Sequence, residues 1–320
     1  MSVRSKAQNM MENYKTTNQM KKTFLVPFLF LVSCNAVEST TPTIDTENHR
    51  FHANIESVES RTYLTEDILL RWTADDRITI FEGTTRNKQY KFLGETGDNA
   101  GDFDYVKAGF GTGNEVDRHY AIYPYNSTTK LSESGVITYT FPAQQNYVVG
   151  SVGLGANVMV AATQSVEDYD LTFRNVGSYL LVKLYGTDQT VESIAITAKG
   201  GEALAGKAYI TPAYRDVPTT EMVGTTSTVT LKSESGVTIG KTADTATAFW
   251  IVLPPFTASQ GISVTVKGYY GGTQTYDVDG EIVFNRNKYK TLTRELTLPS
   301  NGTGMGVGGW GDGENVEGEI

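Results

Sequence analysis

The sequence predicts an all-β protein, and two observations carry that prediction. After residue 61, short runs rich in Val, Ile, Thr, Tyr and Phe are separated by Gly, Asn and Asp every 8 to 12 residues or so, a spacing typical of β-sandwich domains. Several runs alternate apolar and polar residues, as in Ile78-Thr79-Ile80, so each such strand should bury one face. A 3.6-residue period is missing from this region, so we expect helices to be few and short.

The expected strands share this composition and end at turn-forming residues. They cover residues 68–72, 77–81, 89–93, 119–123, 136–141, 158–162, 180–185, 193–199, 208–211, 226–231, 248–253, 263–269, 274–278 and 290–297. An acidic break, SVEDYD, follows Gln164 and separates two blocks of strands. We therefore expect two β-sandwich domains, at residues 62–166 and 167–300.

The N-terminal region predicts export and lipid attachment. Lys21 and Lys22 precede an uncharged apolar stretch, residues 23–33, which ends in Leu31-Val32-Ser33-Cys34. The stretch is shorter than the roughly 20 residues that a membrane-spanning helix needs, so it is interpreted as an export signal, residues 1–33. A start at Met20 would give a signal of usual length. The residues ending at Cys34 match the lipobox of bacterial lipoproteins, whose cysteine is lipidated, and this predicts a lipid anchor.

Charge and cysteine usage exclude two classes of function. The precursor has 27 basic and 36 acidic side chains, and the signal holds five of the basic and one of the acidic ones. The mature chain thus carries 22 against 35, a net charge of −13, and such a surface repels nucleic acid. Cys34 is the single cysteine, so its lipidation leaves neither a disulfide nor a catalytic thiol.

The two ends of the mature chain differ in composition from the strand-rich region. Residues 34–61 are rich in Ser, Thr and Glu and are interpreted as a tether or propeptide that ends in one weak strand. Residues 301–320 form a glycine-rich tail, which cannot fold alone because glycine loses much entropy on ordering and gives no side chain to bury.

Catalytic and metal-binding patterns are weak, and we expect neither an enzyme nor a cofactor nor a metal site. The histidines His49, His52 and His119 lack a second ligand at metal spacing. Three carboxylates between Asp98 and Asp104 could hold a cation, but Ala100 stands where a calcium loop needs an oxygen ligand, so a solvated hairpin turn is the preferred interpretation. Aromatic residues such as Trp72 and Trp250 are expected in the core rather than on a sugar platform.

A series of motifs in this order resembles one known family. The series comprises the lipobox, RTYLTEDILLRWTADDRITIF, HYAIYPY, FPAQQNYVVGSVGLGANVMVAAT, LTFRNVGSYLLVKLYG with SIAITAKGGEALAG, and FWIVLPPFTASQGISVTVKGYYGG. Together they are similar to the fimbrillin (FimA/Mfa-like) family of Bacteroidetes, the subunits of type V pili. The resemblance covers roughly residues 21–298. It implies two tandem transthyretin-like β-sandwich domains of Greek-key type and a subunit exported as a lipoprotein to the cell surface.

The same resemblance implies an assembly mechanism. A trypsin-like protease cuts after an arginine, the N-terminal segment leaves, and a strand from a neighbouring subunit fills the groove. Carried onto this chain, the cut would follow Arg61, or with lower preference Arg50, and residues 51–58 would be the displaced strand. The donor candidates are Val307, Trp310, Val316 and Ile320.

An open sheet edge explains why such exchange is favourable, because a donated strand pairs free backbone groups and covers apolar surface. The glycine-rich tail alternates poorly and would make a weak donor. Arg61 could instead remain uncut in an anchor or tip subunit. The alternative function is a surface lipoprotein that does not polymerise and binds a glycan or a host protein.

Overall fold

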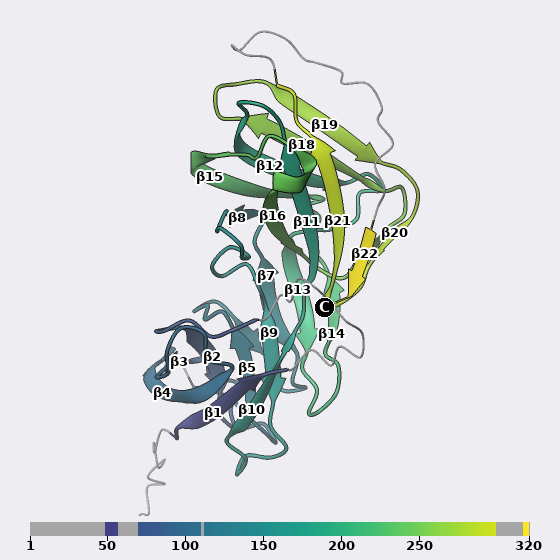
Figure 1. Cartoon of the computed structure of the whole chain (residues 1–320). Coiled ribbons are helices and arrows are strands. Elements are labelled where there is room, and N and C mark those ends of the chain that lie inside the picture. Colours follow the sequence, from purple (N-terminus) through teal and green to yellow (C-terminus); the bar gives the residue numbers. More distant parts are fainter. Residues whose placement is uncertain (1–48, 57–69, 110–111, 299–315, 320) are drawn as a thin grey trace, which may run out of the picture. The chain divides into compact units, whose positions relative to one another are not determined.

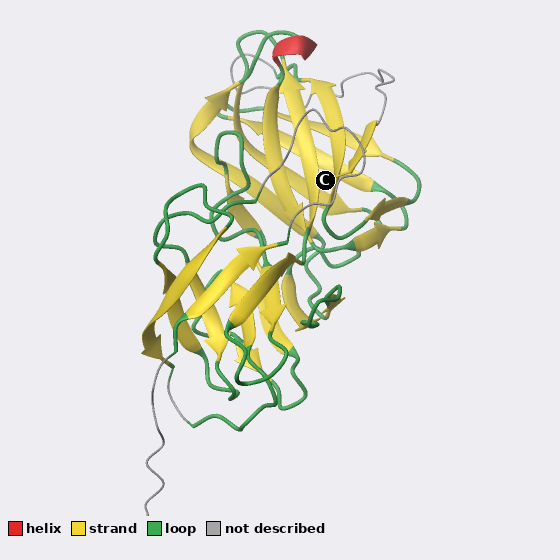
Figure 2. Cartoon of the chain, turned by 60° about the horizontal axis from the view of Figure 1, so that its bottom comes forward, coloured by secondary structure: helices red, strands yellow, loops and turns green. Residues whose placement is uncertain are grey.

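A computed structural model describes residues 49–56, 70–109 and 112–298, together with the backbone of residues 316–319. These residues form β-strands joined by turns and loops, with one short 3-10 helix, η1, at Ala243–Thr245. Figure 2 shows how completely strands dominate the described chain. The predicted all-β class is therefore confirmed.

Seven of the described strands close into a barrel in the order β1-β10-β9-β5-β2-β3-β4 (Figure 1). Neighbouring strands run antiparallel, except that β1 and β10 are parallel. The strands are β1 (Phe51–Ile55), β2 (Arg77–Phe81), β3 (Lys88–Phe92), β4 (Ala100–Ala108), β5 (Tyr120–Tyr123), β9 (Met159–Ala162) and β10 (Asp170–Asn175). Because β1 pairs with both β4 and β10, it joins two edges that would otherwise be open.

Barrel strands β5 and β9 are covered on both faces, which explains their continuous apolar sequence. On β9, Met159 and Ala161 face the barrel interior, while Val160 packs on the outer face. The outer cluster is completed by the sheet β14-β13-β7-β6, which contributes side chains such as Ile137 and Ile210. Its strands are β6 (Lys130–Leu131), β7 (Ile137–Phe141), β13 (Gly206–Thr211) and β14 (Thr219–Met222).

Two further sheets share a single hydrophobic core, in which alternate side chains of β11 face those of β12 and β18. One sheet has the order β16-β11-β21-β22, with β11 (Ser178–Tyr185), β16 (Thr247–Leu253), β21 (Lys288–Glu295) and β22 (Val316–Glu319). The other has the order β19-β18-β12-β15-β8, with β8 (Gln144–Asn146), β12 (Thr190–Ala198), β15 (Thr228–Thr238), β18 (Ile262–Gly268) and β19 (Thr273–Val278). Strands β17 (Phe256–Ala258) and β20 (Ile282–Phe284) pair antiparallel as a separate two-stranded sheet, with β18 and β19 between them in the sequence.

The side chain of Gln145 links these two sheets. Its backbone belongs to β8, which pairs with β15, while its buried amide contacts the backbone of Val252 on β16. Gln145 Nε2 donates to the Val252 carbonyl at 2.6 Å, and the Val252 N–H donates to Gln145 Oε1 at 3.0 Å. The amide thus satisfies backbone groups of β16 as a neighbouring strand would.

Strand pairing also crosses the predicted boundary near residue 167. Strand β10 lies after that boundary and belongs to the barrel, whereas β7 lies before it and pairs with β13. Described strands on the two sides of that boundary are therefore joined by backbone pairing.

Most expected strands are present. The structure also contains strands that were not expected, namely β6, β8, β10, β14, β17 and β20, and two further differences have physical reasons. Residues 70–72 were expected in a strand and form none. The side chain of Trp72 is buried in the barrel core, and its backbone N–H donates to the carbonyl of Asp98, in a turn, at 2.8 Å. The second difference is β4, since the expected hairpin turn at residues 98–104 is confined to residues before Ala100. Asp102 and Asp104 lie in the strand itself, where backbone pairing with β1 and β3 outweighs their low strand propensity.

Candidate functional site

The candidate site is strand β1 together with the residues that surround it. We call the surrounding part, formed by β4, β10 and the side chains that contact β1, the β1 seat. Phe51, Ala53 and Ile55 point into the barrel core and are fully or almost fully buried, whereas His52 is exposed. This alternation follows from the two-residue period of a strand. On one side residues 52–55 pair in parallel with residues 170–173, and on the other side residues 51–54 pair antiparallel with residues 103–100.

The first inward side chain of β1 fills an aromatic pocket. The Phe51 ring makes edge-to-face contacts with the rings of Tyr90, His119 and Tyr169, at centroid distances of 5.4, 5.0 and 5.4 Å. Such pairs add to the stabilisation that burial of the ring provides. Phe51 is therefore a principal apolar contact between β1 and the barrel.

The buried carboxylate of Glu82 binds His49, which lies two residues before Phe51. Glu82 Oε1 lies 2.7 Å from His49 Nδ1, and Glu82 Oε2 accepts hydrogen bonds from Lys88 Nζ and the Tyr90 hydroxyl, both at 2.6 Å. Burial opposes ionisation of Glu82, but the hydrogen bonds from Lys88, Tyr90 and His49 outweigh it and lower its pKa. Burial and the Glu82 contact raise the pKa of Tyr90, so its hydroxyl stays a donor.

Ionic contacts on the solvent side hold the start of β1. Arg50 Nε and a terminal guanidinium nitrogen donate to the two carboxylate oxygens of Asp104 at 2.6 and 3.0 Å. His52 Nδ1 lies 2.9 Å from Asp102 Oδ1. The Asp104 hydrogen bond raises the pKa of Arg50. These groups are exposed, with both aspartate side chains 43% accessible, so we expect them to contribute little to stability.

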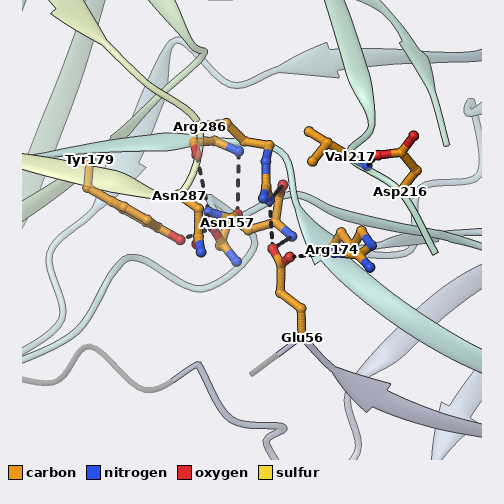
Figure 3. Close-up of polar contacts among 10 residues, drawn as sticks. Glu56, Asn157, Arg174, Tyr179, Asp216, Val217, Arg286 and Asn287 are labelled. Carbon is orange, nitrogen blue, oxygen red and sulfur yellow. Dashed lines mark hydrogen bonds and ion pairs between the residues drawn. The ribbon is translucent and has the colours of Figure 1, made fainter. Parts of the chain in front are cut away.

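The end of β1 is held by a more buried cluster, shown in Figure 3. Glu56 Oε1 accepts hydrogen bonds from Arg286 at 2.6 Å and from the Asn175 N–H at 2.8 Å, and Glu56 Oε2 accepts one from Arg174 at 3.2 Å. The Glu56 side chain is 10% accessible, against 24% for Arg174 and 21% for Arg286. Three donors thus converge on one partly buried carboxylate, an arrangement that makes strong hydrogen bonds.

The backbone fixes the position of that carboxylate. The Glu56 N–H donates to Phe173 O at 2.8 Å, which continues the β1–β10 ladder by one residue. Arg286 also donates to Asn175 O at 2.7 Å, and Asn175 Nδ2 donates to Asn287 Oδ1 at 3.1 Å. The loop before β21 is thereby attached to the end of β10, and the contact of Arg286 with Asn175 O does not involve β1.

A separate cleft of about 450 Å³ lies away from β1 and is lined by residues that include Trp72, Asp76, Tyr123 and Trp250. Asp76 Oδ1 accepts a hydrogen bond from the Tyr123 hydroxyl at 3.2 Å, and burial raises the pKa of Asp76. Both tryptophans are buried in hydrophobic clusters, as the sequence interpretation expected. Their faces therefore offer little area on which a sugar ring could stack.

Among the predicted site residues, the structure places Arg50 directly before β1 and Val316 at the start of β22, whose backbone pairs with β21. Cys34, Arg61, Val307, Trp310 and Ile320 lie outside the described residues. Sequence reasoning missed the residues that hold the ends of β1. Glu56 and Arg286 are separated by 230 positions, and no local motif connects them. The Asp102 and Asp104 carboxylates were noted, but as members of a turn.

Within the described ranges, no group of three or more His, Cys, Asp or Glu side chains is arranged to hold a metal ion. No helix in that part of the chain is long and apolar enough to cross a membrane.

Comparisons with known proteins give structural neighbours only. No family model and no curated protein matches the chain. A candidate cell adhesion protein from Bacteroides ovatus has a TM-score of 0.44 and 15% identity, over 78% of this chain and 92% of that one.

Two further neighbours carry fimbrial names. A fimbrial assembly protein from Parabacteroides distasonis has a TM-score of 0.35 and 11% identity, over 77% of this chain and 90% of that one. The tip fimbrial protein Mfa3 from Porphyromonas gingivalis has a TM-score of 0.31 and 9% identity, over 79% and 97%. These neighbours are fimbrial and cell adhesion proteins of Bacteroidetes, the class that the sequence motifs resemble. At these values the similarity does not by itself assign a function.

Proposed function

We propose that the chain is a structural subunit of a cell-surface fibre, a type V pilus, and that subunits join by exchanging the strand in the β1 seat. The observation that carries this proposal is the position of β1. It contributes three core side chains to the barrel, yet it is the first strand of the described residues and lies within the predicted propeptide, residues 34–61. Its removal would leave β4 and β10 with unpaired backbone groups beside an apolar slot, which another extended segment can fill.

The topology favours Arg61 over Arg50 as the processing site. A cut after Arg50 falls directly before Phe51 and leaves β1 attached to the barrel through residues 56–76. A cut after Arg61 falls between β1 and β2 and separates β1 from the rest of the chain. Cleavage by a trypsin-like protease at Arg61 would therefore release β1 together with the lipid on Cys34, which delivers the subunit to the outer membrane.

The incoming strand would come from another subunit, and the tail from Val307 to Ile320, including Trp310 and Val316, is the donor candidate. In the isolated chain the backbone of residues 316–319 pairs with residues 288–291 of β21. That pairing uses few residues at the edge of a sheet, so exchange of the tail into a neighbouring subunit requires little unfolding. The assembled fibre would then serve adhesion.

The test is limited proteolysis of the mature chain with a trypsin-like protease, read as ladders that resist SDS on a gel. We expect ladders from the parent chain and from Arg50→Gln, but none from Arg61→Gln. Deletion of residues 302–320 should also abolish them. Clean release of β1 without any ladder would contradict the proposal.

Ligand binding by a lipoprotein that does not polymerise is the second candidate function, and the cleft beside Asp76 is the observation that favours it. A chain that stays monomeric after cleavage, and that retains a glycan from an array through this cleft, would support this alternative. Asp76→Asn would be the matched variant, since the amide preserves the size of the side chain.

A further inference from the structure

The end of the β1 seat is a carboxylate-binding site. When β1 is present, Glu56 receives hydrogen bonds from Arg286, Arg174 and the Asn175 N–H, at distances between 2.6 and 3.2 Å. When β1 leaves, both guanidinium groups lose this carboxylate. Asn175 is fully buried, so its N–H would lose its acceptor as well. Leaving partly buried charges and a buried donor without partners is costly.

An incoming strand avoids that cost when it supplies a carboxylate at the same place. The register is defined, because the Glu56 N–H bonds to Phe173 O and the preceding inward residue, Ile55, lies opposite Phe173. The carboxylate must therefore belong to the residue that directly follows the last inward apolar residue of the strand. At the position of Ala53, two residues before Ile55, the seat accepts only a small side chain, because Ala53 is completely buried in a packed core.

We propose that Arg286, with Arg174, determines which strands the β1 seat accepts, and that the preferred occupant is an extended segment of another chain with the pattern large apolar, any, small, any, apolar, acidic. This inference rests on the proposed strand exchange and adds the chemistry of the incoming strand. In the tail named above as the donor candidate, Val316-Glu317 supplies the apolar and acidic positions, whereas Glu314 stands at the small position and Asp312 at the large apolar one, so the tail meets the pattern only in part. Arg286 comes from the loop before β21, far from the barrel in sequence, so partner choice depends on both halves of the chain.

The opposite end of the seat should discriminate much less. Asp102 and Asp104 hold Arg50 and His52 in exposed positions, where ion pairs are screened and contribute little. A strand with or without a basic residue before its first apolar position should thus bind almost equally well. The Arg50 end of the peptide therefore serves as a control for its Glu56 end.

The experiment uses the mature chain with a specific protease site inserted between residues 57 and 69. After folding and cutting, the labelled β1 fragment stays in its seat without a covalent link, and unlabelled peptides compete for that seat. The probe peptides have the sequence of residues 49–58, either unchanged, with Glu56→Gln, or with Arg50→Gln. Displacement of the label is followed by fluorescence anisotropy.

We expect the Glu56→Gln peptide to compete at least about tenfold less well than the unchanged peptide, because it loses charged hydrogen bonds. The Arg50→Gln peptide should compete within about twofold. In an Arg286→Ala chain the penalty for Glu56→Gln should shrink severalfold, whereas an Arg215→Ala chain, which changes an exposed arginine with no part in the cluster, should keep it.

The outcomes separate the two proposals. If no peptide displaces the β1 fragment, the seat does not exchange and the proposed function is overturned together with this inference. If all peptides displace it equally, exchange stands and the role of Arg286 is overturned. Should Arg286→Ala fail to fold, the comparison of the three peptides on the parent chain still decides the question.

Discussion

At the scale of single residues, His119, which packs against Phe51 of β1, should make the stability of the barrel depend on pH. His119 packs edge-on against Phe51 and stacks on Tyr169 at 5.3 Å. His119 Nε2 lies 2.8 Å from Val166 O, and among the described residues no hydrogen-bond partner faces Nδ1. Burial lowers the pKa of His119 below its ordinary value of 6.5, although nearby Glu82 and Asp168 favour the charged form.

The sign of the resulting pH dependence follows from linkage. Because the pKa of His119 is lower in the folded chain, the unfolded chain takes up the proton first on acidification. The contribution of His119 to the free energy of unfolding is therefore complete above pH 6.5 and is lost as the pH falls below that value. We expect urea denaturation to show decreasing stability from pH 7.5 to 5.5, a range of about two units in which histidine titrates.

Substitution isolates this effect from the other titrating groups. His119→Gln can still donate to Val166 O but cannot be protonated, so its stability curve should be flatter over the same range. His52→Gln changes an exposed histidine on β1 and should retain the slope of the parent chain. A slope that is equal in both variants would show that another group causes it.

At the scale of elements, the two faces of β1 should respond differently to the same added side chain. Ala53 is completely buried between Phe51 and Ile55, so Ala53→Leu forces extra atoms into a filled core and should cost about 1 to 3 kcal/mol. His52→Leu places the same side chain on the exposed face and should stay within about 0.5 kcal/mol. Urea denaturation measures both, and equal costs would mean that β1 is not seated in the barrel core.

Which elements could be predicted from the sequence depended on how locally each one is specified. Strand β2 was predicted with its bounds, because Ile78 and Ile80 alternate with polar residues. The expected solvent-facing side was wrong, however, since Thr79 is completely buried where a second layer covers the outer face of the barrel. Strand β9 was predicted from its unbroken apolar run, which reflects coverage on both faces. Strand β4 was missed, because Gly101 and its aspartates favour a turn locally and only pairing with β1 and β3 overrides that preference.

The same reasoning explains how much of the candidate site could be predicted. Phe51 and Ile55 were assigned to the displaced strand from the family resemblance, because the residues themselves show little hydrophobic pattern beyond Phe51, Ile55 and Val58. The contacts that hold the strand were not, because Arg286 meets Glu56 across 230 positions. Long-range ion pairs leave no periodic pattern in a sequence, so they emerge only when the fold is known.

At the scale of the whole molecule, residues 47–320 should unfold as one cooperative unit rather than as two domains divided near residue 167. Strand β7 pairs with β13, β8 pairs with β15, and Arg286 links the loop before β21 to the ends of β1 and β10. Unfolding one half alone would therefore break strand pairs and expose apolar surface in the other half.

The tryptophans allow this to be measured, because Trp72 lies in the barrel core and Trp250 on β16. With Trp310 replaced by Phe, a second Trp→Phe change leaves a single reporter in either half of the chain. We expect the urea transitions of the Trp72-only and Trp250-only chains to coincide once each is corrected for the stability of its own variant by circular dichroism. Separate midpoints, with the far-ultraviolet signal lost in two steps, would instead show that the halves fold independently and that the shared strands do not couple them.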